Sequence, residues 1–547
     1  MKSVMQNNRF SQTPTIDAPR SRFDRSHGHK FTMDAGWLVP YYWDSVLPGD
    51  SFQMNTTAFA RLATPLFPIM DNMYIDTHFF FVPTRLIWDN FRKFCGEQTN
   101  PGDSIDYSIP ILAGSGIASS AHADPSSSAN NQRALLMNYI GIPHGIAASD
   151  VDISALPFRA YQMIYSEWFR DQNLIDSPTQ TTADGPDNTG TAGYCELRRR
   201  GKRHDYFTSA LPWPQKGDAV ALPLGTTAPI NPETTSSAPL FKQAGGAVTN
   251  QSLMFASGTA NTNWLGSGTG TLEAQWVDPA LVADLTNATA ATINDLREAF
   301  QVQKLLERDA RSGTRYSELV KNHFGVNFYD VSYRPEYLGG GSSPINISPV
   351  TSQAETISSG TSDGTGVGSL SAIGTASVNG HGFSKSFVEH GIVMGLMSVR
   401  MDLTYQKGLR RELSHSTRYD YYWPSLAHLG EQEILNKEIY CDGSANDDLV
   451  FGYQERYAEY RYKPSQISGL FQSDATGSLD AWHLSQDYAT LPTLGESFIN
   501  EDGYTTSVLD RCVQVPSEPH FIVDTYNRLI CARPMPTYGV PGMIDHF

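Results

Sequence analysis

The sequence predicts a mainly β protein, an antiparallel sheet sandwich with long excursions between its strands. Short runs rich in aromatic and β-branched residues recur along the chain, which is typical of strands. Helical patterns occur only as isolated inserts, so the strand–helix alternation of a parallel sheet is missing. Three stretches have no periodicity and exceed the length of ordinary loops, namely 109–131, 224–275 and 358–382.

The predicted strands are recognised by continuous or alternating apolar residues. They include 37–43, 52–54, 74–82, 399–406 and 521–531. The Phe79–Phe81 run within 74–82 predicts a strand that is buried on both faces. Residues 399–406 alternate between apolar and polar side chains and predict the clearest strand, with one face in water.

Three helices are predicted as inserts between the strands. The first lies within 84–94 and the second covers 158–174. The third has the strongest signals, because Thr292 can cap its N-terminus, Asp295 stands at the third helical position and Gly313 can end it.

Composition narrows the classes of function. Charged residues make up 18% of the 547 residues, against about 25% in a typical globular protein. Aromatic residues reach 11%, and the formal net charge is −17. A chain this acidic does not bind nucleic acid over its whole surface, although a local basic patch remains possible. Few charges and many aromatic residues indicate surfaces that are buried against other chains.

The compartment follows from the cysteines and from the apolar segments. The five cysteines are odd in number and far apart, and no CxxC pair occurs. We therefore expect scattered free thiols in a reducing compartment rather than a disulfide framework. The N-terminus lacks a signal-peptide pattern and no apolar run is long enough for a membrane span, so we expect a soluble chain.

Catalytic and metal-binding motifs are weak or missing. No P-loop, nucleophile elbow or HExxH motif occurs. The glycines at 364–368 are better explained by a flexible loop than by a phosphate loop. His27 and His29 are more simply a solvated or backbone-bonded pair than metal ligands, and 442–448 is read as a turn rather than a calcium loop. The sequence thus predicts no enzyme, no cofactor and no metal site.

Two basic features are candidates for contact with DNA or with another subunit. One is the N-terminal segment, where a contact with nucleic acid and packing against a neighbouring chain are equally compatible with the sequence. The other is a basic cluster with three open interpretations: contact with phosphate, a solvated loop, or an ion pair between subunits. The candidate residues are Arg9, Arg20, Arg22, Arg25 and Lys30 in the segment, and Arg198, Arg199, Arg200, Lys202 and Arg203 in the cluster.

Two tracts are rich in tyrosine. They lie at 419–423 and 453–462. Exposed tyrosines could stack on bases. Because basic residues are not in excess around them, packing at a protein interface is the preferred interpretation.

Several long blocks carry a resemblance to a known family. They include WLVPYYWDSVLPGD at 37–50, LPWPQKG at 211–217, RPEYLGGGS at 334–342, GHGFSKSFVEHG at 380–391 and NDDLVFGYQERYAEYRYKPSQISGLF at 446–471. In these blocks and in their order the chain resembles the major capsid proteins of gokushoviruses, which belong to the Microviridae. These are small icosahedral bacteriophages with single-stranded DNA.

The resemblance implies both a fold and an assembly. The implied fold is an eight-stranded antiparallel viral jelly roll with long loop insertions that contain a few helices. Pentamers would build a T=1 shell of sixty copies around a circular single-stranded DNA genome. The protein would be a virion component, assembled in the cytoplasm of a bacterial host. The implied partners are an internal scaffolding protein, a small basic DNA-binding protein, a minor pilot protein and a receptor on the host surface.

The resemblance also implies a domain organisation. Residues 1–36 would form a basic arm, and 37–223 with 281–547 the jelly-roll core. The variable insertion 224–280 would be a surface protrusion near the three-fold axes that meets the host. The candidate attachment residues within it are Asn250, Asn263 and Trp264. An alternative function is that of an adhesion or glycan-binding module displayed on a particle. A hydrolase would need a nucleophile–base pair, for which the sequence gives no sign.

Overall fold

The computed structural model describes residues 19–114, 116–220, 293–327, 333–353, 368–500 and 508–539, together with the backbone of short strands between residues 230 and 283. The chain divides into two compact units. The first unit joins Met1–Pro214 to Ser312–Phe547, and the second is Gln215–Arg311. Most of the predicted insertion 224–280 lies outside the described residues, within the second unit.

One sheet of the first unit has the strand order β1-β22-β4-β18-β17, with β2 also paired to β22. All of its pairs are antiparallel. Its strands are β1 Ser21–Asp24, β2 His27–Met33, β4 Ser51–Leu62, β17 Asn346–Thr351, β18 Leu370–Ser386 and β22 Phe521–Arg533. Burial alternates residue by residue along β4 and β22, so one face of this sheet covers the core and the other is exposed.

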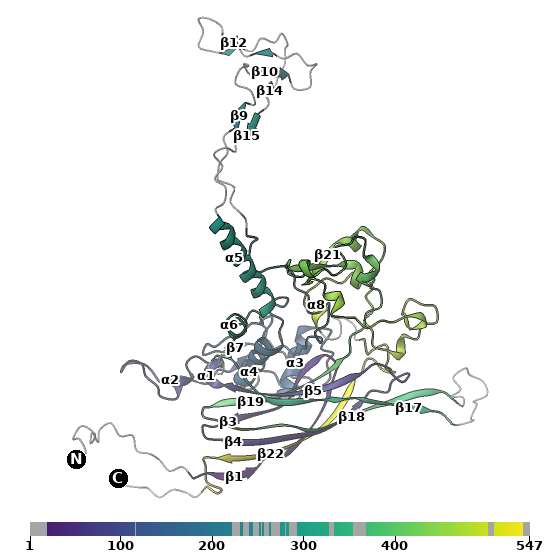
Figure 1. Cartoon of the computed structure of the whole chain (residues 1–547). Helices are drawn as coiled ribbons and strands as arrows, with labels where there is room; N and C mark the ends of the chain where they lie inside the picture. The colour runs from purple at the N-terminus through teal and green to yellow at the C-terminus, as the bar shows by residue number, and fades with distance from the viewer. Residues whose placement is uncertain are drawn as a thin grey trace. The chain divides into compact units, whose positions relative to one another are not determined.

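The second sheet has the order β16-β5-β19-β3-β8 and is also antiparallel. Its strands are β3 Trp37–Val46, β5 Met73–Pro83, β8 Arg198–Arg199, β16 Glu336–Pro344 and β19 Gly391–Met401. Figure 1 shows the two sheets stacked. The ring centroids of Phe79 in β5 and Phe383 in β18 lie 5.3 Å apart. Aromatic side chains therefore fill the space between the sheets.

Helices cover the other face of the second sheet (Figure 1). They pack on β3, β5 and β19, which explains why β5 and β19 are buried on both faces. The helices of this part are α1 Thr84–Ile87, α2 Phe91–Phe94, α3 Ala129–Ile140, α4 Leu156–Ile164 and the π-helical turn Tyr165–Phe169. A short parallel pair joins β6 Leu112–Ala113 to β7 Asp187–Asn188, and α6 covers Tyr316–Phe324.

The excursion between β19 and β22 packs with residues 174–210 around a second, smaller core, which includes Phe207, Tyr405, Ile434, Phe451 and Phe498. Its regular elements are β20 Glu431–Leu435, β21 Val450–Glu455, α7 Asn436–Ile439 and α8 Glu496–Ile499. Its 3₁₀ turns are Arg411–Ser414, Pro424–Leu426, Ala445–Asp448, Ala458–Tyr460, Gly469–Phe471 and Asp480–Trp482. This second cluster of buried residues explains how so long an excursion can be ordered.

The described residues of the second unit form short strands and one long helix. The strands are β9 Ile230–Pro232, β10 Leu240–Gln243, β11 Gln251–Ser252, β12 Met254–Phe255, β13 Thr262–Asn263, β14 Ala274–Asp278 and β15 Leu281–Ala283. The helix, α5, is Ile293–Ser312, and Gly313 follows it with φ +92°. The predicted third helix is therefore confirmed, while its expected cap Thr292 lies outside the described residues.

The prediction of a mainly β protein with antiparallel sheets is confirmed, and so are the strands expected at 37–43, 52–54, 74–82 and 521–531. The strand expected at 399–406 is wrong, because β19 ends at Met401 and is buried on both faces. Beyond it the chain leaves the sheet, and Tyr405 packs in the core of the excursion. The alternating residues of 399–406 thus lie partly in the sheet and partly in the core of the excursion.

The glycine-rich stretch 358–382 differs from the expectation that it lacks regular structure, because its end forms part of the long strand β18. Gly374 explains why. A Cβ at this position would lie 2.7 Å from the Cβ of Leu62 on the neighbouring strand. Glycine therefore allows close packing between the strands here rather than flexibility.

The predicted N-terminal arm 1–36 also differs from the structure. From Ser21 onward the segment pairs with β22 as β1 and β2, and residues 1–18 lie outside the described residues. Backbone hydrogen bonding to an adjacent strand overrides the lack of an apolar pattern.

The predicted helices differ in their boundaries. Residues 84–94 form the two short helices α1 and α2. The helix expected at 158–174 begins earlier, at Leu156, and ends in the π-helical turn at Phe169. The start of α3 lies in the aperiodic stretch 109–131, where no helix is expected from the sequence.

All five cysteines are free. Cys195, Cys512 and Cys531 are buried, whereas Cys95 and Cys441 are exposed. Within the described ranges, no helix is both long and apolar enough to cross a bilayer.

Candidate functional site

The basic cluster at 198–203 lies beside the second sheet rather than on an open surface. Arg198 and Arg199 form β8 and pair with Leu38 and Trp37 of β3. Arg200 and Lys202 have relative exposures of only 8% and 5%. The cluster therefore extends the sheet, and the charged side chains of Arg200 and Lys202 are buried.

Arg200 is held by an acidic residue of the sheet. Its Nη1 lies 2.9 Å from Oδ2 of Asp76, and Arg400 Nη2 lies 2.7 Å from the same oxygen. Burial raises the pKa of Asp76, but a hydrogen bond from Ser342 and the two arginine charges outweigh it and lower the pKa below its ordinary value. One carboxylate thus compensates two guanidinium groups.

The other side chains of the cluster contact aromatic rings. The guanidinium of Arg199 lies 4.4 Å from the ring centroid of Trp37, and that of Arg203 lies 4.3 Å from Tyr74. Lys202 Nζ lies 5.0 Å from the centroid of Phe498. These distances fit cation–π contacts, which stabilise a cation that is partly removed from water.

Arg198 is held mainly by polar groups. Its Nε donates to Gln162 Oε1 at 2.9 Å, and its Nη1 lies 3.6 Å from Glu196. Arg203 additionally pairs with Asp402 at 3.2 Å. The predicted contact of this cluster with DNA or another subunit stays a prediction, and the burial of Arg200 and Lys202 within the chain counts against it for these two residues. The three other members make intrachain contacts.

The candidate cations of the N-terminal segment occupy different environments. Arg25 pairs with Asp44, and Arg20 donates to the backbone oxygen of Gly49. Arg22 and Lys30 lie on strands β1 and β2 and are exposed. Arg9 lies outside the described residues. Pairing with β22 thus places Arg22 and Lys30 in one sheet.

Of the candidate attachment residues, Asn250 and Trp264 lie outside the described residues, and only the backbone of Asn263 is described, in β13. Their role stays a prediction. The His27–His29 pair is held by backbone groups, since the Nδ1 atoms lie 2.9 Å from Arg25 O and 2.8 Å from Tyr41 O. Among the described residues, no group of three or more His, Cys, Asp or Glu side chains could hold a metal ion.

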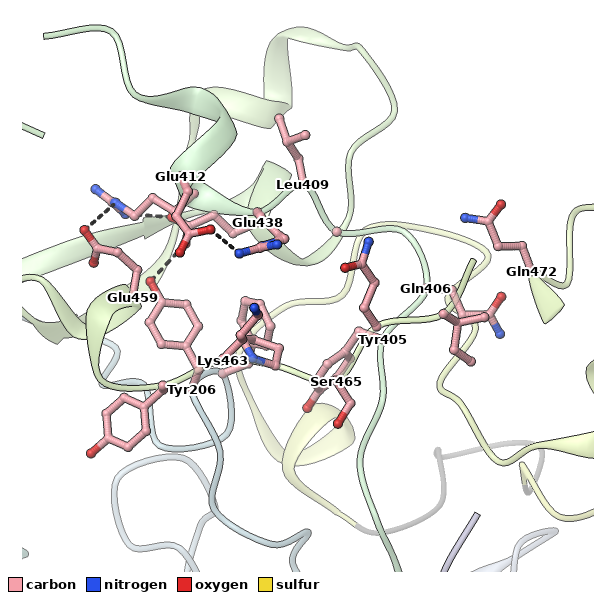
Figure 2. Close-up of a pocket in the computed structure, with 18 residues that line it drawn as sticks. Tyr206, Tyr405, Gln406, Leu409, Glu412, Glu438, Glu459, Lys463, Ser465 and Gln472 are labelled. Carbon is pink, nitrogen blue, oxygen red and sulfur yellow. Dashed lines mark hydrogen bonds and ion pairs between the residues drawn. The ribbon is translucent and has the colours of Figure 1, made fainter. Parts of the chain in front are cut away.

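A pocket of about 160 Å³ lies between the excursion that joins β19 to β22 and residues 206–207. Figure 2 shows Tyr206, Glu438 and Glu459 on one side of it and Gln472 on the other. Arg411 joins the acidic side, because its Nη1 lies 2.7 Å from Glu438 Oε1. The pocket thus has an ionic wall beside a lining that mixes aromatic, aliphatic, amide and further charged side chains.

The two carboxylates of this wall, Glu438 and Glu459, differ in the hydrogen bonds that they accept. Glu438 accepts hydrogen bonds from the Tyr206 hydroxyl at 2.9 Å and from the backbone N–H of Leu435 at 3.0 Å. Burial raises the pKa of Glu438 even though Arg411 opposes the shift. The carboxylate of Glu459 is buried and accepts no hydrogen bond from the described residues, and its nearest cation, Arg411 Nε, is 4.0 Å away. Glu438 thus holds the wall together, and Glu459 contributes mainly charge.

Sequence reasoning missed this pocket. Its lining comes from residues 206–207, 405–412, 438, 459–467 and 472, which no motif connects. The tyrosine tract at 419–423 is a sequence-predicted interface, and the structure leaves it open to solvent. The relative exposures are 53% for Tyr419, 59% for Tyr421, 51% for Tyr422 and 50% for Trp423.

Comparison with known proteins gives one consistent result. A family model described as Capsid protein (F protein) matches residues 11–543. The capsid protein VP1 of Bdellovibrio phage phiMH2K is 45% identical over 559 residues, which cover 98% of this chain and 98% of that protein. VP1 of Chlamydia phage 1 is 41% identical over 613 residues, with 99% and 98% covered. VP1 of Spiroplasma virus 4 is 33% identical over 569 residues, with 98% and 97% covered.

Proposed function

The chain belongs to the phage capsid protein (F protein) family, and we propose on this premise that sixty copies assemble through pentamers into a T=1 shell around a circular single-stranded DNA genome. The expected likeness to gokushovirus major capsid proteins is confirmed, so the chain is a structural component of the virion. The observation that carries the proposal is the near-complete coverage of both chains in each comparison. A chain collinear with capsid proteins has the same parts available for assembly.

The strand order supports an eight-stranded jelly roll as the fold of the shell-forming part. In one sheet the order is β2-β22-β4-β18, and in the other it is β3-β19-β5-β16. Early strands lie beside late ones in both sheets, as two nested Greek keys require. The connections from β5 to β16 and from β19 to β22 are the long insertions of this fold.

The exposed tyrosine tract supports burial against neighbouring copies. Tyrosine and tryptophan are favoured at the centres of protein interfaces, and several of them together are unusual on the surface of a monomer. We assign the tract at 419–423 to a joint between subunits. Shell formation would cover side chains that are half exposed in the single chain.

The acidity of the chain supports a need for cationic partners. Each copy contributes a formal charge of −17, which cannot neutralise packaged DNA. A small basic DNA-binding protein supplies this charge in the proposed particle. An internal scaffolding protein guides assembly, and a minor pilot protein completes the particle.

The insertion 224–280 is proposed as the protrusion that meets a host receptor, with Asn250, Asn263 and Trp264 on its surface. The uncharged, Ser/Thr/Asn-rich composition of 224–275 supports a variable loop region rather than a core element. The alternative is that attachment to a glycan or receptor is the chain's primary role and that shell building is secondary.

Assembly tests the main proposal. The full chain is expressed with its scaffolding partner, and particles are sought by sedimentation and electron microscopy. We expect closed particles of sixty copies that contain single-stranded DNA. A chain that remains monomeric under all assembly conditions, including with the scaffolding partner present, contradicts the proposal.

Deletion of residues 230–270 tests the insertion. If particles form normally but no longer attach to host cells, the insertion serves attachment. If the deletion blocks particle formation, the insertion is architectural and the attachment proposal fails.

A further inference from the structure

Among the described residues, no helix covers the outer face of the sheet β1-β22-β4-β18-β17. The described helices pack mainly on the second sheet, and α3 also reaches the edge strand β2, where the Tyr139 hydroxyl donates to Thr32 O at 2.8 Å. Figure 1 shows no helix beyond β22 and β4. Each outward residue of β4 stands opposite an outward residue of β22, so their side chains share one surface. We call this surface, defined by the outward residues of β1, β2, β4, β18 and β22, the outer sheet face.

Two aromatic rings stand on the outer sheet face. Phe59 of β4 and Tyr526 of β22 each have a relative exposure of 54%. Phe59 pairs with Asp524, and Tyr526 pairs with Thr57, so the two rings are diagonal neighbours on adjacent strands. Diagonal neighbours are about 7 to 8 Å apart. This spacing leaves room for a flat ring to stack on each of them.

Cations lie on the same face as these rings, two of them beside the rings and Arg22 farther along β22, opposite Ala532. Arg61 follows Phe59 by two residues on β4, and Arg528 follows Tyr526 by two residues on β22. Arg22 of β1 is likewise exposed. Within the part of the chain that the structure describes, these three arginines form no hydrogen bond or ion pair, in contrast to the buried cluster at 198–203. Their guanidinium groups are available to an outside anion.

Two carboxylates also lie on the face. Asp524 faces Lys30 of β2 at 3.3 Å, and both side chains remain largely in water. Hydrogen bonding to Ser26 lowers the pKa of Asp24, and the charges of Arg528 and Arg22 add a smaller effect. The face thus carries four cations and two carboxylates, against the acidic balance of the whole chain.

We propose that the outer sheet face binds single-stranded DNA, with Phe59 and Tyr526 stacking on bases and Arg22, Arg61 and Arg528 contacting phosphates. Exposed aromatic side chains beside unpaired arginines are the chemistry that unstacked bases and a phosphodiester backbone require. The polar side chains of Asn55, Thr57 and Ser377 line the same surface and can accept and donate hydrogen bonds. The inference rests on the proposed packaging of single-stranded DNA and names the surface that meets it.

The chemistry favours DNA over a second copy of the chain. A copy-to-copy contact would leave the arginines without partners unless the facing surface were acidic and aromatic at once. A duplex is also disfavoured, because its bases are already stacked and cannot cover the rings.

Removal of the rings gives the first test. The purified, unassembled chain is titrated with a labelled single-stranded oligonucleotide, and the same strand in a duplex is the comparison. Phe59→Thr and Tyr526→Thr keep strand-forming residues but remove the stacking surface. We expect each to weaken single-strand binding about fivefold or more, and Phe59→Tyr to retain binding. Unchanged affinity in both ring variants, with a normal unfolding curve, overturns the proposal.

Removal of the arginines gives an independent readout. For single-stranded DNA, the slope of log K against log salt concentration changes by about 0.7 for each phosphate contact. The double variant Arg61→Gln/Arg528→Gln should therefore flatten the slope by about 1.4. The ring variants should lower affinity and leave the slope unchanged. An unchanged slope in the arginine variant overturns the assignment of phosphate contacts.

A matched control is available in the same unit. Arg418→Gln and Tyr421→Thr remove one cation and one exposed ring of the tyrosine tract outside the sheet. Neither should alter oligonucleotide binding. Control variants that weaken binding as much as the ring variants show a non-specific effect and overturn the proposal.

Particles separate this inference from the proposed function. If the unmodified chain forms no particles, the proposed function fails. If the ring variants form particles with normal DNA content, the outer sheet face is not the DNA surface and the capsid role stands. If they bind oligonucleotide normally but fail to assemble, the face is a contact between copies and the inference is wrong.

Discussion

Arg200 and Asp76 form an ion pair of 2.9 Å, with only 9% and 3% of their side chains exposed. The pair ties the segment that follows β8 to strand β5. Arg400 of β19 shares the same carboxylate oxygen at 2.7 Å. Three segments far apart in the sequence therefore depend on one acidic side chain.

Asp76→Asn should strongly destabilise the chain. The substitution leaves the buried charge of Arg200 and the partly buried charge of Arg400 without a countercharge. Loss of one partner of a buried pair typically costs about 3 to 5 kcal/mol. The free energy of unfolding in urea measures the loss. Asp524→Asn is the control, since its partner Lys30 is exposed and such pairs contribute about 0 to 1 kcal/mol. Equal losses for the two variants would contradict the role of Asp76.

The ion pair also predicts a dependence on acid. The pKa of Asp76 is lowered in the folded chain, so its contribution is present above its unfolded pKa, near 3.8, and is lost as the pH falls through the folded value. Stability of the unmodified chain should therefore fall at the acid end of the range. Asp76→Asn should remove this part of the dependence.

The burial of His78 predicts that stability also depends on pH in a second range, above the range of Asp76. Burial, with a smaller effect of Arg200, lowers the pKa of His78 to about 3 from an ordinary value of 6.5. Below pH 6.5 the unfolded chain takes up a proton that the folded chain refuses, so stability decreases as the pH falls from 6.5 to about 3. The slope is at most about 1.4 kcal/mol per pH unit.

His78→Gln tests this window, because glutamine cannot titrate. Urea unfolding at a series of pH values between 6.5 and 3 should show a shallower decline for the variant than for the unmodified chain. Parallel curves would mean that another group causes the dependence. Asp76→Asn separates the two effects, since the Asp76 window lies below pH 3.8.

The sequence was sufficient for several strands of the two sheets but not for the burial of the basic cluster. Alternation at Phe52 and Met54 and the run Phe79–Phe81 predicted strands, because one-sided and two-sided burial leave different residue patterns. The charges of Arg200 and Lys202 gave no sign of burial. Their partners, such as Asp76 and Tyr488, are far away in the sequence, so only the folded sheet brings them together.

For the outer sheet face, in contrast, part of the signal is present in the sequence. Phe59 and Arg61 occupy the polar phase of an alternating strand, and this position alone indicates exposure. The aromatic residue on the wet side was a readable signal. Its neighbour Tyr526 comes from the other end of the chain, and the register that joins them requires the sheet.

Substitutions in the basic cluster should therefore affect folding rather than packaging. Arg200→Gln removes one of the two guanidinium partners of Asp76 and the donor to the Ser398 hydroxyl from a buried polar site, and we expect a loss of about 2 to 4 kcal/mol of unfolding free energy. The DNA content of those particles that do assemble should be normal. Stable particles with reduced DNA content would show instead that Arg200 reaches the genome.

Gly382 makes a prediction about backbone packing. A Cβ at this position would collide with the backbone oxygen of Met54 on β4. Gly382→Ala must therefore push two core strands apart, and we expect a loss of about 1 to 3 kcal/mol or more. Gly102→Ala is the control, because a Cβ added there would have no atom within 4 Å. A thermal unfolding midpoint unchanged by Gly382→Ala would contradict the close approach of the strands.

The ionic wall of the pocket in Figure 2 predicts unequal roles for its two carboxylates. Glu438→Ala removes the acceptor of Tyr206, Arg411 and the Leu435 N–H, and we expect a loss of about 2 to 4 kcal/mol. Glu459→Ala removes a buried carboxylate that accepts no hydrogen bond from the described residues.

The cost of Glu459→Ala should stay within about 1 kcal/mol, because the desolvation penalty disappears together with a weak 4.0 Å attraction to Arg411. Urea unfolding of the two variants in parallel measures both values. A larger loss for Glu459→Ala than for Glu438→Ala would reverse the assignment. It would mean that the buried charge of Glu459, rather than the hydrogen-bonded Glu438, holds Arg411 against the pocket.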